Sequence, residues 1–136
     1  MIRIIGFAAL LVISLNSSAE WIQVGYSDSS YSYVDLDSKK AKGDVIEVLT
    51  LVDEKMPDYE FQGKYIFLSR KLVNELDCEN KRLRILSTIR YSGGMGKGEV
   101  VDSYSGPSQW EKISDGSIGN DLLKLVCIEV GLISSN

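Results

Sequence analysis

The fold of this 136-residue chain is decided by Val45-Ile-Glu-Val-Leu-Thr-Leu-Val52. Its residues are apolar at both odd and even positions, apart from Glu47 and Thr50, and most of them are β-branched. A strand of this composition buries both of its faces, which happens inside a sheet rather than at its edge. The stretch therefore predicts a central strand.

Short strands and turns extend outward from this segment in both directions. The predicted strands are 21–26, 31–35, 45–52, 65–76, 82–91 and 99–104. Residues 35–39 are expected to form a tight helical turn, and Lys42-Gly43-Asp44 predicts a hairpin. Pro57-Asp58 and Gly63 predict a loop. The pattern indicates a sheet of about six short strands.

The strand at 65–76 has two kinds of face in this interpretation. Ile66, Leu68, Leu72 and Leu76 share one parity, which Arg70 interrupts. Ser69, Lys71 and Glu75 have the opposite parity, which is typical of a solvent-exposed face.

A helix is predicted near the end of the chain, from Ile118 to about Val130. Ser117 is placed to cap it and Asp121 lies in its first turn. Its apolar side is wide enough to dock on a sheet, and Cys127 lies within that side. The expected class is α+β, with a single antiparallel sheet and one C-terminal helix packed on it.

Residues 1–19 have the zones of a secretory signal peptide. Arg3 supplies a positive charge, residues 4–15 are apolar, and Ser17-Ser18-Ala19 precede a cut at Glu20. The alternative is an N-terminal core helix. Residues 20–136 then form one exported domain in the periplasm or at the cell surface. The predicted cut site has no cysteine, so we expect no lipid anchor and no membrane anchor.

The charge balance limits the classes of partner. The chain has 15 basic and 19 acidic residues, a net charge of −4, and removal of Arg3 with the leader leaves 14 basic residues and −5. An acidic domain argues against nucleic-acid binding, which needs clustered Lys and Arg. It also argues against broad adsorption to anionic membranes.

Cys78 and Cys127 are the two cysteines of the chain. Thiols of an exported domain are oxidised, which favours one structural disulfide between them. Closing a loop of about 50 residues stabilises the fold by about 4 kcal/mol in the chain-entropy model. The alternatives are a metal site or a catalytic thiol. The absence of histidine and of a C-x-x-C spacing argues against both.

The sequence lacks an obvious catalytic constellation. Zero histidine removes the commonest general base and the usual nucleophile pairs. The carboxylate pairs, Asp35 with Asp37 and Asp53 with Glu54, suit turn capping. Ser69 and Lys71 would share one strand face, where a Ser-Lys dyad is conceivable, but an exposed polar strand face is the simpler explanation. We therefore expect no enzyme activity and no cofactor.

A glycine-rich connection at 92–98 superficially resembles a phosphate-binding loop. Its glycines stand at the wrong spacing, and Gly98 occupies the place of the metal-binding Ser or Thr. A loop with positive φ at several positions accounts for these glycines.

The concentrated basic residues are Lys81, Arg82, Arg84 and Arg90. The three arginines have one parity, so they would line one face of the strand at 82–91. An ordinary solvated strand face is the favoured interpretation, and a patch that attracts acidic protein partners is the alternative.

Taken in order, several short motifs resemble the surface-adhesin protein E family of small exported bacterial proteins. The matching motifs are Trp21, Tyr33-Val-Asp35 with Ser38, Asp53, Ser69 with Lys71, Asp77-Cys78 with Arg82 and Arg84, Tyr91-Ser-Gly-Gly-Met-Gly-Lys-Gly98, Trp110, Gly116-Ser-Ile118 and Leu125-Val-Cys127. They span nearly the whole exported domain.

The resemblance implies a curved antiparallel sheet with a C-terminal helix tied across it by a disulfide. It also implies a non-enzymatic role in binding host matrix or plasma proteins, and homodimers. Members of that kind carry a lipid anchor, which we do not expect here. The alternative function is a periplasmic accessory domain of an envelope assembly without adhesin activity.

Overall fold

The computed structural model describes residues 19–60 and 65–129, and the side chains of residues 58–60, 65 and 129 are not described. The predicted signal peptide, apart from Ala19, and the predicted loop residue Gly63 lie outside this part of the chain. The elements are β1 (Ile22–Tyr26), β2 (Ser30–Lys42), β3 (Val45–Glu60), β4 (Tyr65–Asp77), β5 (Arg82–Tyr91), a 3-10 turn η1 (Gly94–Gly96), β6 (Val100–Ser105), β7 (Glu111–Lys112) and α1 (Ile118–Glu129).

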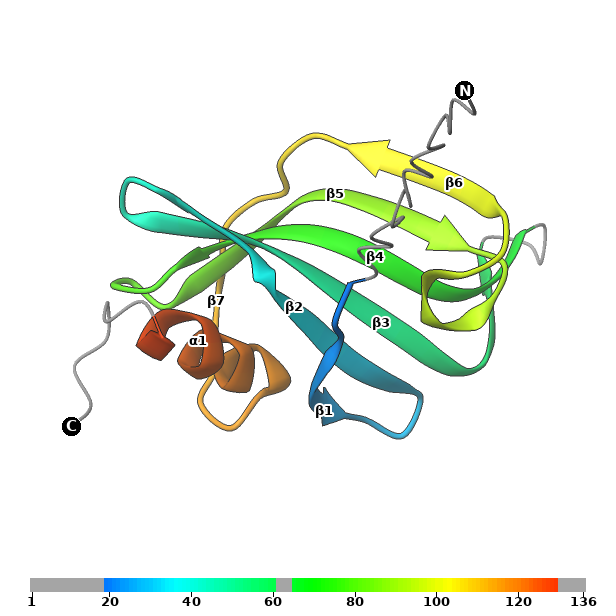
Figure 1. The fold of residues 1–136 in the computed structure, drawn as a ribbon, viewed down its shortest axis with the longest axis horizontal. Helices are drawn as coiled ribbons and strands as arrows, with labels where there is room; N and C mark the ends of the chain where they lie inside the picture. The colour runs from blue at the N-terminus through cyan, green and yellow to red at the C-terminus, as the bar shows by residue number, and fades with distance from the viewer. Residues whose placement is uncertain (1–18, 61–64, 130–136) are drawn as a thin grey trace, which may run out of the picture.

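The strands form one open antiparallel sheet in the order β1-β2-β3-β4-β5-β6, and β7 pairs with the start of β5. Figure 1 shows β1 and β6 at the two edges and α1 against one surface of the sheet. β3 lies between β2 and β4, which confirms the central strand predicted from 45–52. The α+β class with one C-terminal helix is confirmed as well.

Two local expectations are wrong for one reason, which is that the long strands contain bulges. Residues 35–39 form no helical turn, because β2 continues through them with a register shift between Asp35 and Lys40. Ser38 Oγ donates to Asp35 O at 2.6 Å and accepts from Leu49 N at 2.8 Å, which secures the bulge. Pro57 ends no strand either: β3 continues to Glu60 through a shift between Asp53 and Asp58, where a proline is tolerated.

The helix face is the surface of the sheet that carries Ile46, Val48 and Leu76. Leu123 and Val126 of α1 pack on it, and all five side chains are at most 1% exposed. Ser117 Oγ accepts a hydrogen bond from Asn120 N at 3.1 Å, which confirms the predicted helix cap. The predicted end of the helix at Val130 lies outside the described residues.

A disulfide joins Cys78 to Cys127, 49 positions apart in sequence, and confirms the predicted pairing. Cys78 follows β4 directly, and Cys127 lies on the buried side of α1. The bond therefore ties the helix to the sheet through the core of the helix face.

The loop face is the opposite surface, which carries Leu51, Asp53 and Ser69. The expectation that the Ser69 parity faces solvent is wrong, because Ser69 is 0% exposed and Glu75 is buried. The glycine-rich connection between β5 and β6 folds back over this surface, as its hydrogen bonds below show. The sheet is thus covered on both faces, by α1 at one end and by this connection toward the other.

Candidate functional site

The arginines of β5 do not share one face, which corrects the expectation from their parity. Asn74 of β4 pairs with Ile85, whereas Val73 pairs with Ser87, so Leu86 is an extra residue in β5. A bulge of this kind reverses the faces of all residues beyond it. Arg82 and Arg84 therefore lie on the loop face, and Arg90 lies on the helix face.

Arg82 and Arg84 are each held by a buried carboxylate of β4. Arg82 Nε lies 2.9 Å from Asp77 Oδ2, and Arg84 Nη2 lies 2.9 Å from Glu75 Oε1. The carboxylates have side-chain exposures of 5% and 9%, whereas the Arg82 side chain is 44% exposed. The buried carboxylates thus hold the arginine side chains in place, and the guanidinium groups remain at the surface.

The pKa of Asp77 reflects this environment. Burial by itself would raise the pKa, but hydrogen bonds from the side chain and backbone N–H of Asn80 and from Arg82 outweigh it and lower the pKa. The Asn80 bonds measure 3.1 Å from the backbone and 2.9 Å from Nδ2. Asp77 is therefore a charged anchor for both Arg82 and the turn after β4.

Trp110 joins the two arginines into one surface. Its half-buried ring lies 4.7 Å from the guanidinium carbon of Arg82 and 4.6 Å from that of Arg84. Both distances are within the range of cation–π attraction. Trp110 entered the sequence interpretation only as part of the family motifs. Its contact with both arginines depends on the return of the chain through β7, which the sequence pattern did not reveal.

Lys81 and Lys112 extend this surface. Lys81 is exposed in the turn between β4 and β5, and its carbonyl oxygen accepts a hydrogen bond from Ile113 N at 2.9 Å. Lys112 is exposed and stands opposite Arg82 in the β5–β7 pairing. We define the Arg–Trp patch by these residues: Lys81, Arg82, Arg84, Trp110 and Lys112.

Arg90 belongs to a separate cluster on the helix face. Its Nη1 lies 3.2 Å from Asp102 Oδ2 and 3.3 Å from the Tyr104 hydroxyl. Its guanidinium also lies 5.0 Å from the ring centroids of Phe67 and Tyr104. Of the four basic residues singled out in the sequence, the structure brings together Lys81, Arg82 and Arg84, and leaves Arg90 apart.

The glycine-rich connection is latched to the loop face by side chains of β3 and β4. Met95 N donates to Asp53 Oδ1 at 2.7 Å, and Gly96 N donates to Ser69 Oγ at 2.8 Å. Ser69 Oγ in turn donates to Gly93 O at 2.6 Å. Met95 has a φ of 56° and Gly96 a φ of 70°, as expected for a connection that needs positive φ.

This latch explains residues that the sequence offered as candidate chemistry. The Ser69 hydroxyl is committed to backbone groups, and Lys71 Nζ lies 5.1 Å from the Tyr91 ring centroid. Asp35 Oδ1 accepts from Asp37 N at 3.1 Å, which is the turn-capping role expected of that pair. In residues 19–60 and 65–129, no three side chains of the metal-ligating types cluster together.

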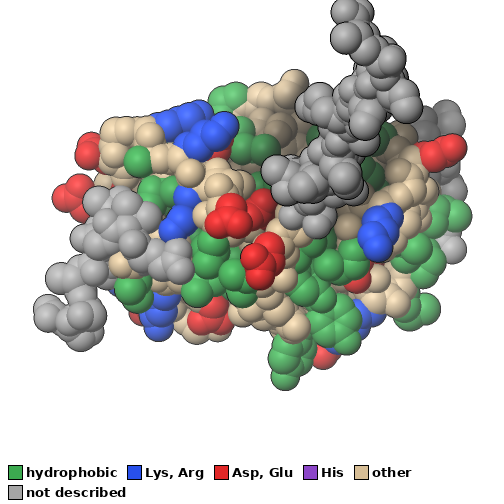
Figure 2. All heavy atoms as spheres, viewed as in Figure 1, with side chains coloured by type: hydrophobic (Ala, Val, Ile, Leu, Met, Phe, Trp, Pro, Cys, Tyr) green, Lys and Arg blue, Asp and Glu red, His purple; other side chains and the backbone are tan. Residues whose placement is uncertain are grey.

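The side of the molecule that carries α1 is mixed in charge. Figure 2 shows that Lys and Arg side chains are interspersed with Asp and Glu on the side of the molecule that carries α1. Within the described part of the chain, no helix has the length and apolar character needed to cross a membrane.

Comparisons with known proteins agree with this architecture. The model of the surface-adhesin protein E family matches residues 21–128. No curated protein matches the chain. A structure of Haemophilus influenzae protein E superposes with a TM-score of 0.63 at 14% identity, covering 82% of this chain and 93% of that one.

A crystal structure of protein E from non-typeable Haemophilus influenzae gives a TM-score of 0.61 at 15% identity, covering 86% of this chain and 81% of that one. At these identities the likeness shows a shared fold. The family model spans the disulfide, the latch and the Arg–Trp patch, which all lie within residues 21–128. The chain belongs to the surface-adhesin protein E family.

Proposed function

We propose that the chain is an exported protein-binding module and that its contact surface is the Arg–Trp patch. The observation that carries this proposal is the contact of the Trp110 ring with the guanidinium groups of both Arg82 and Arg84. Tryptophan and arginine are the side chains most enriched among residues that dominate binding energy at protein interfaces. Here they are held in place by the buried acids beneath them, so little side-chain freedom is lost on binding.

The partner that suits this patch is an acidic protein surface. Lys81 and Lys112 add positive charge beyond the arginines, which Glu75 and Asp77 balance. Membership of the adhesin family supports a host matrix or plasma protein as that partner. The proposed role is binding without catalysis, because the latch engages the Ser69 hydroxyl and Asp53, Asp35 caps a turn, and Glu75 and Asp77 pair with arginines.

A binding experiment on immobilised basement-membrane extract and on plasma proteins tests the patch. Trp110→Ala and the double variant Lys81→Glu/Lys112→Glu should weaken binding about tenfold or more, and added salt should weaken wild-type binding. Lys40→Glu/Lys124→Glu makes the same charge change at exposed positions elsewhere and serves as the control. Equal binding by the patch variants and the control would contradict the proposal.

Cell fractionation tests the location. Surface exposure predicts that protease added to whole cells cleaves the protein. Protein found only in the periplasmic extract, and protected in whole cells, would favour the periplasmic accessory role instead.

We also propose that a homodimer forms through a sheet edge. The sheet order leaves β1 and β6 as edge strands, and β6 exposes Val100 by 58% and Tyr104 by 51%. Unpaired edges with apolar side chains favour strand pairing between copies. Sedimentation equilibrium should report a dimer that Val100→Lys converts to monomer, and a monomeric wild type would contradict the idea.

A further inference from the structure

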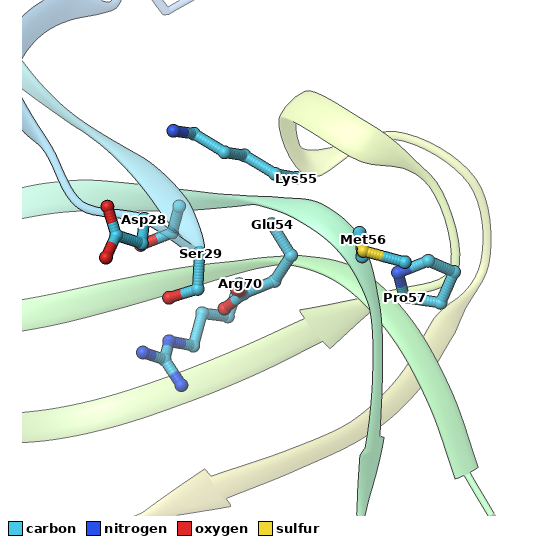
Figure 3. Close-up of a pocket in the computed structure, with 8 residues that line it drawn as sticks. Asp28, Ser29, Glu54, Lys55, Met56, Pro57 and Arg70 are labelled. Carbon is cyan, nitrogen blue, oxygen red and sulfur yellow. The ribbon is translucent and has the colours of Figure 1, made fainter.

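A cavity of about 420 Å³ lies on the helix face, at the end of the sheet away from the disulfide. Figure 3 shows its walls, which come from the β1–β2 turn, from the outer part of β3 and from β4. The residues that matter for its chemistry are Asp28, Ser29, Ser30, Glu54, Lys55 and Arg70. Its size falls within the range of small-molecule and peptide-side-chain pockets, roughly 300–1,000 Å³.

Arg70 is the residue of this cavity whose buried side-chain donor lacks an acceptor. Its cross-strand neighbours are Val52 on β3 and Arg90 on β5. Arg90 has Asp102 as an ionic partner at 3.2 Å. The Nε of Arg70 is buried and has no hydrogen-bond partner among the residues that the structure describes. A buried donor without an acceptor is costly, so an acceptor supplied by a ligand would be stabilising.

The second cation of the cavity is already engaged. Lys55 Nζ donates to Ser27 O at 2.7 Å and lies 4.7 Å from the Tyr31 ring centroid. Figure 3 shows Lys55 extending away from Arg70, whereas the Arg70 guanidinium lies below Ser29 in this view, and Asp28, Ser29 and Arg70 line the same cavity. Arg70 is therefore the cation that faces the cavity.

The other charged and polar side chains that line the cavity favour a ligand with one negative charge over one with two. Asp28 lines the same space and would repel a doubly charged phosphate more strongly than a singly charged carboxylate. A planar, singly charged carboxylate fits the donor fork of a guanidinium. Asp28 is then placed to accept an N–H or ammonium group of the same ligand, and Ser29 supplies a hydroxyl.

We propose that Arg70 makes this cavity a binding site for a carboxylate whose neighbouring atoms carry a nitrogen donor. A free acidic amino acid and an acidic residue within a peptide both have this chemistry. The site lies on the opposite face from Arg82, and Arg70 is seven positions from Asp77 in β4, which is on the order of 20 Å along an extended strand. It is therefore independent of the Arg–Trp patch.

Titration of the full chain, followed by the arginine Nε–Hε signals in NMR, tests the site. The probes are free glutamate, a capped Gly-Glu-Gly peptide, the matching Gly-Gln-Gly peptide and inorganic phosphate. Saturable shifts of the Arg70 signal are expected with the glutamate probes. Binding of the glutamine peptide and of phosphate is expected to be roughly tenfold weaker or more. Tighter binding of free glutamate than of the capped peptide would identify an amino acid as the ligand, and equal binding would identify a peptide side chain.

The variants are Arg70→Gln, Arg70→Lys and the control Arg82→Gln. Arg70→Gln should lose binding, Arg70→Lys should retain part of it, and Arg82→Gln should bind as the wild type does. If Arg70→Gln fails to fold, Arg70→Lys and the comparison of the glutamate and glutamine peptides decide the question. Non-saturable shifts, equal binding of the two peptides, phosphate binding as tight as carboxylate binding, or unchanged binding by the Arg70 variants would each overturn the site.

Discussion

The two covered faces of the sheet are held by different physics. On the helix face, apolar side chains such as Ile46 and Leu123 are buried together and a disulfide closes the contact. On the loop face, Asp53 and Ser69 hold the backbone of Met95 and Gly96 by single hydrogen bonds. Burial is non-directional and scales with area, whereas each hydrogen bond depends on one donor and one acceptor. The helix face therefore supplies most of the stability, whereas the loop face positions the glycine-rich connection.

The largest effect should come from removing the disulfide. Cys78→Ser/Cys127→Ser should lower the free energy of unfolding by about 4 kcal/mol, because the bond closes a loop of 49 positions in the unfolded chain. Urea denaturation measures the loss. The reduced wild type serves as a matched control and should behave like the double variant. An unchanged midpoint would contradict the stapling role.

A core truncation on the same face should cost somewhat less. Leu123→Ala should destabilise by about 3 kcal/mol, since its side chain is 1% exposed and truncation leaves a cavity. Ile128→Ala, on the same helix but 50% exposed, should stay within about 0.5 kcal/mol of the wild type. Similar losses for the two variants would show that α1 is not bound through the side described here.

The loop face should respond to the loss of one hydroxyl. Ser69→Ala leaves Gly96 N and Gly93 O without their partner and should cost about 2 kcal/mol. The loss should appear as faster hydrogen exchange at Gly96, with little change in the amides of α1. Ser103→Ala, on an exposed position of β6, is the control. Unaltered exchange at Gly96 in Ser69→Ala would contradict the latch.

The smallest effect should be the pH dependence due to Asp77. Its pKa in the folded protein is lowered from the ordinary 3.8, so its ionised form stabilises the fold fully above that value. This contribution is lost as the pH falls below 3.8 through the lowered pKa. Thermal melting between neutral and acidic pH should therefore show a drop that Asp77→Asn reduces and the exposed Asp115→Asn does not. Identical pH profiles for the two variants would contradict this assignment.

The elements that rest on local patterns were predictable. The central strand at 45–52, the Gly43 hairpin and the helix capped by Ser117 each follow from residues adjacent in sequence. The cysteine pairing followed because only two cysteines are present and the leader predicts an oxidising compartment. Such signals need no knowledge of how distant segments meet.

The candidate sites were predictable only in part. Lys81, Arg82 and Arg84 were identified, but the extra residue Leu86 moves Arg90 to the other face, and a bulge has no reliable sequence signal. Ser69 was expected to face solvent because it alternates along the strand with two charged residues, Lys71 and Glu75. Ser69 is buried because the glycine-rich connection, more than twenty positions further along the chain, folds over it. Arg70 lines the cavity because the register of β4 places its side chain on the helix face.

The sequence by itself determined the class of the fold, the disulfide and the family motifs, because composition and periodicity encode which segments pair and which side of the helix is buried. The three-dimensional fold sets which arginines share a surface, what covers the polar face of β4 and which arginine lines the cavity at the far end of the sheet. The physical reason is that side-chain direction in a strand changes with every bulge. A single inserted residue therefore redistributes charge between the two faces without altering the pattern that predicts the strand.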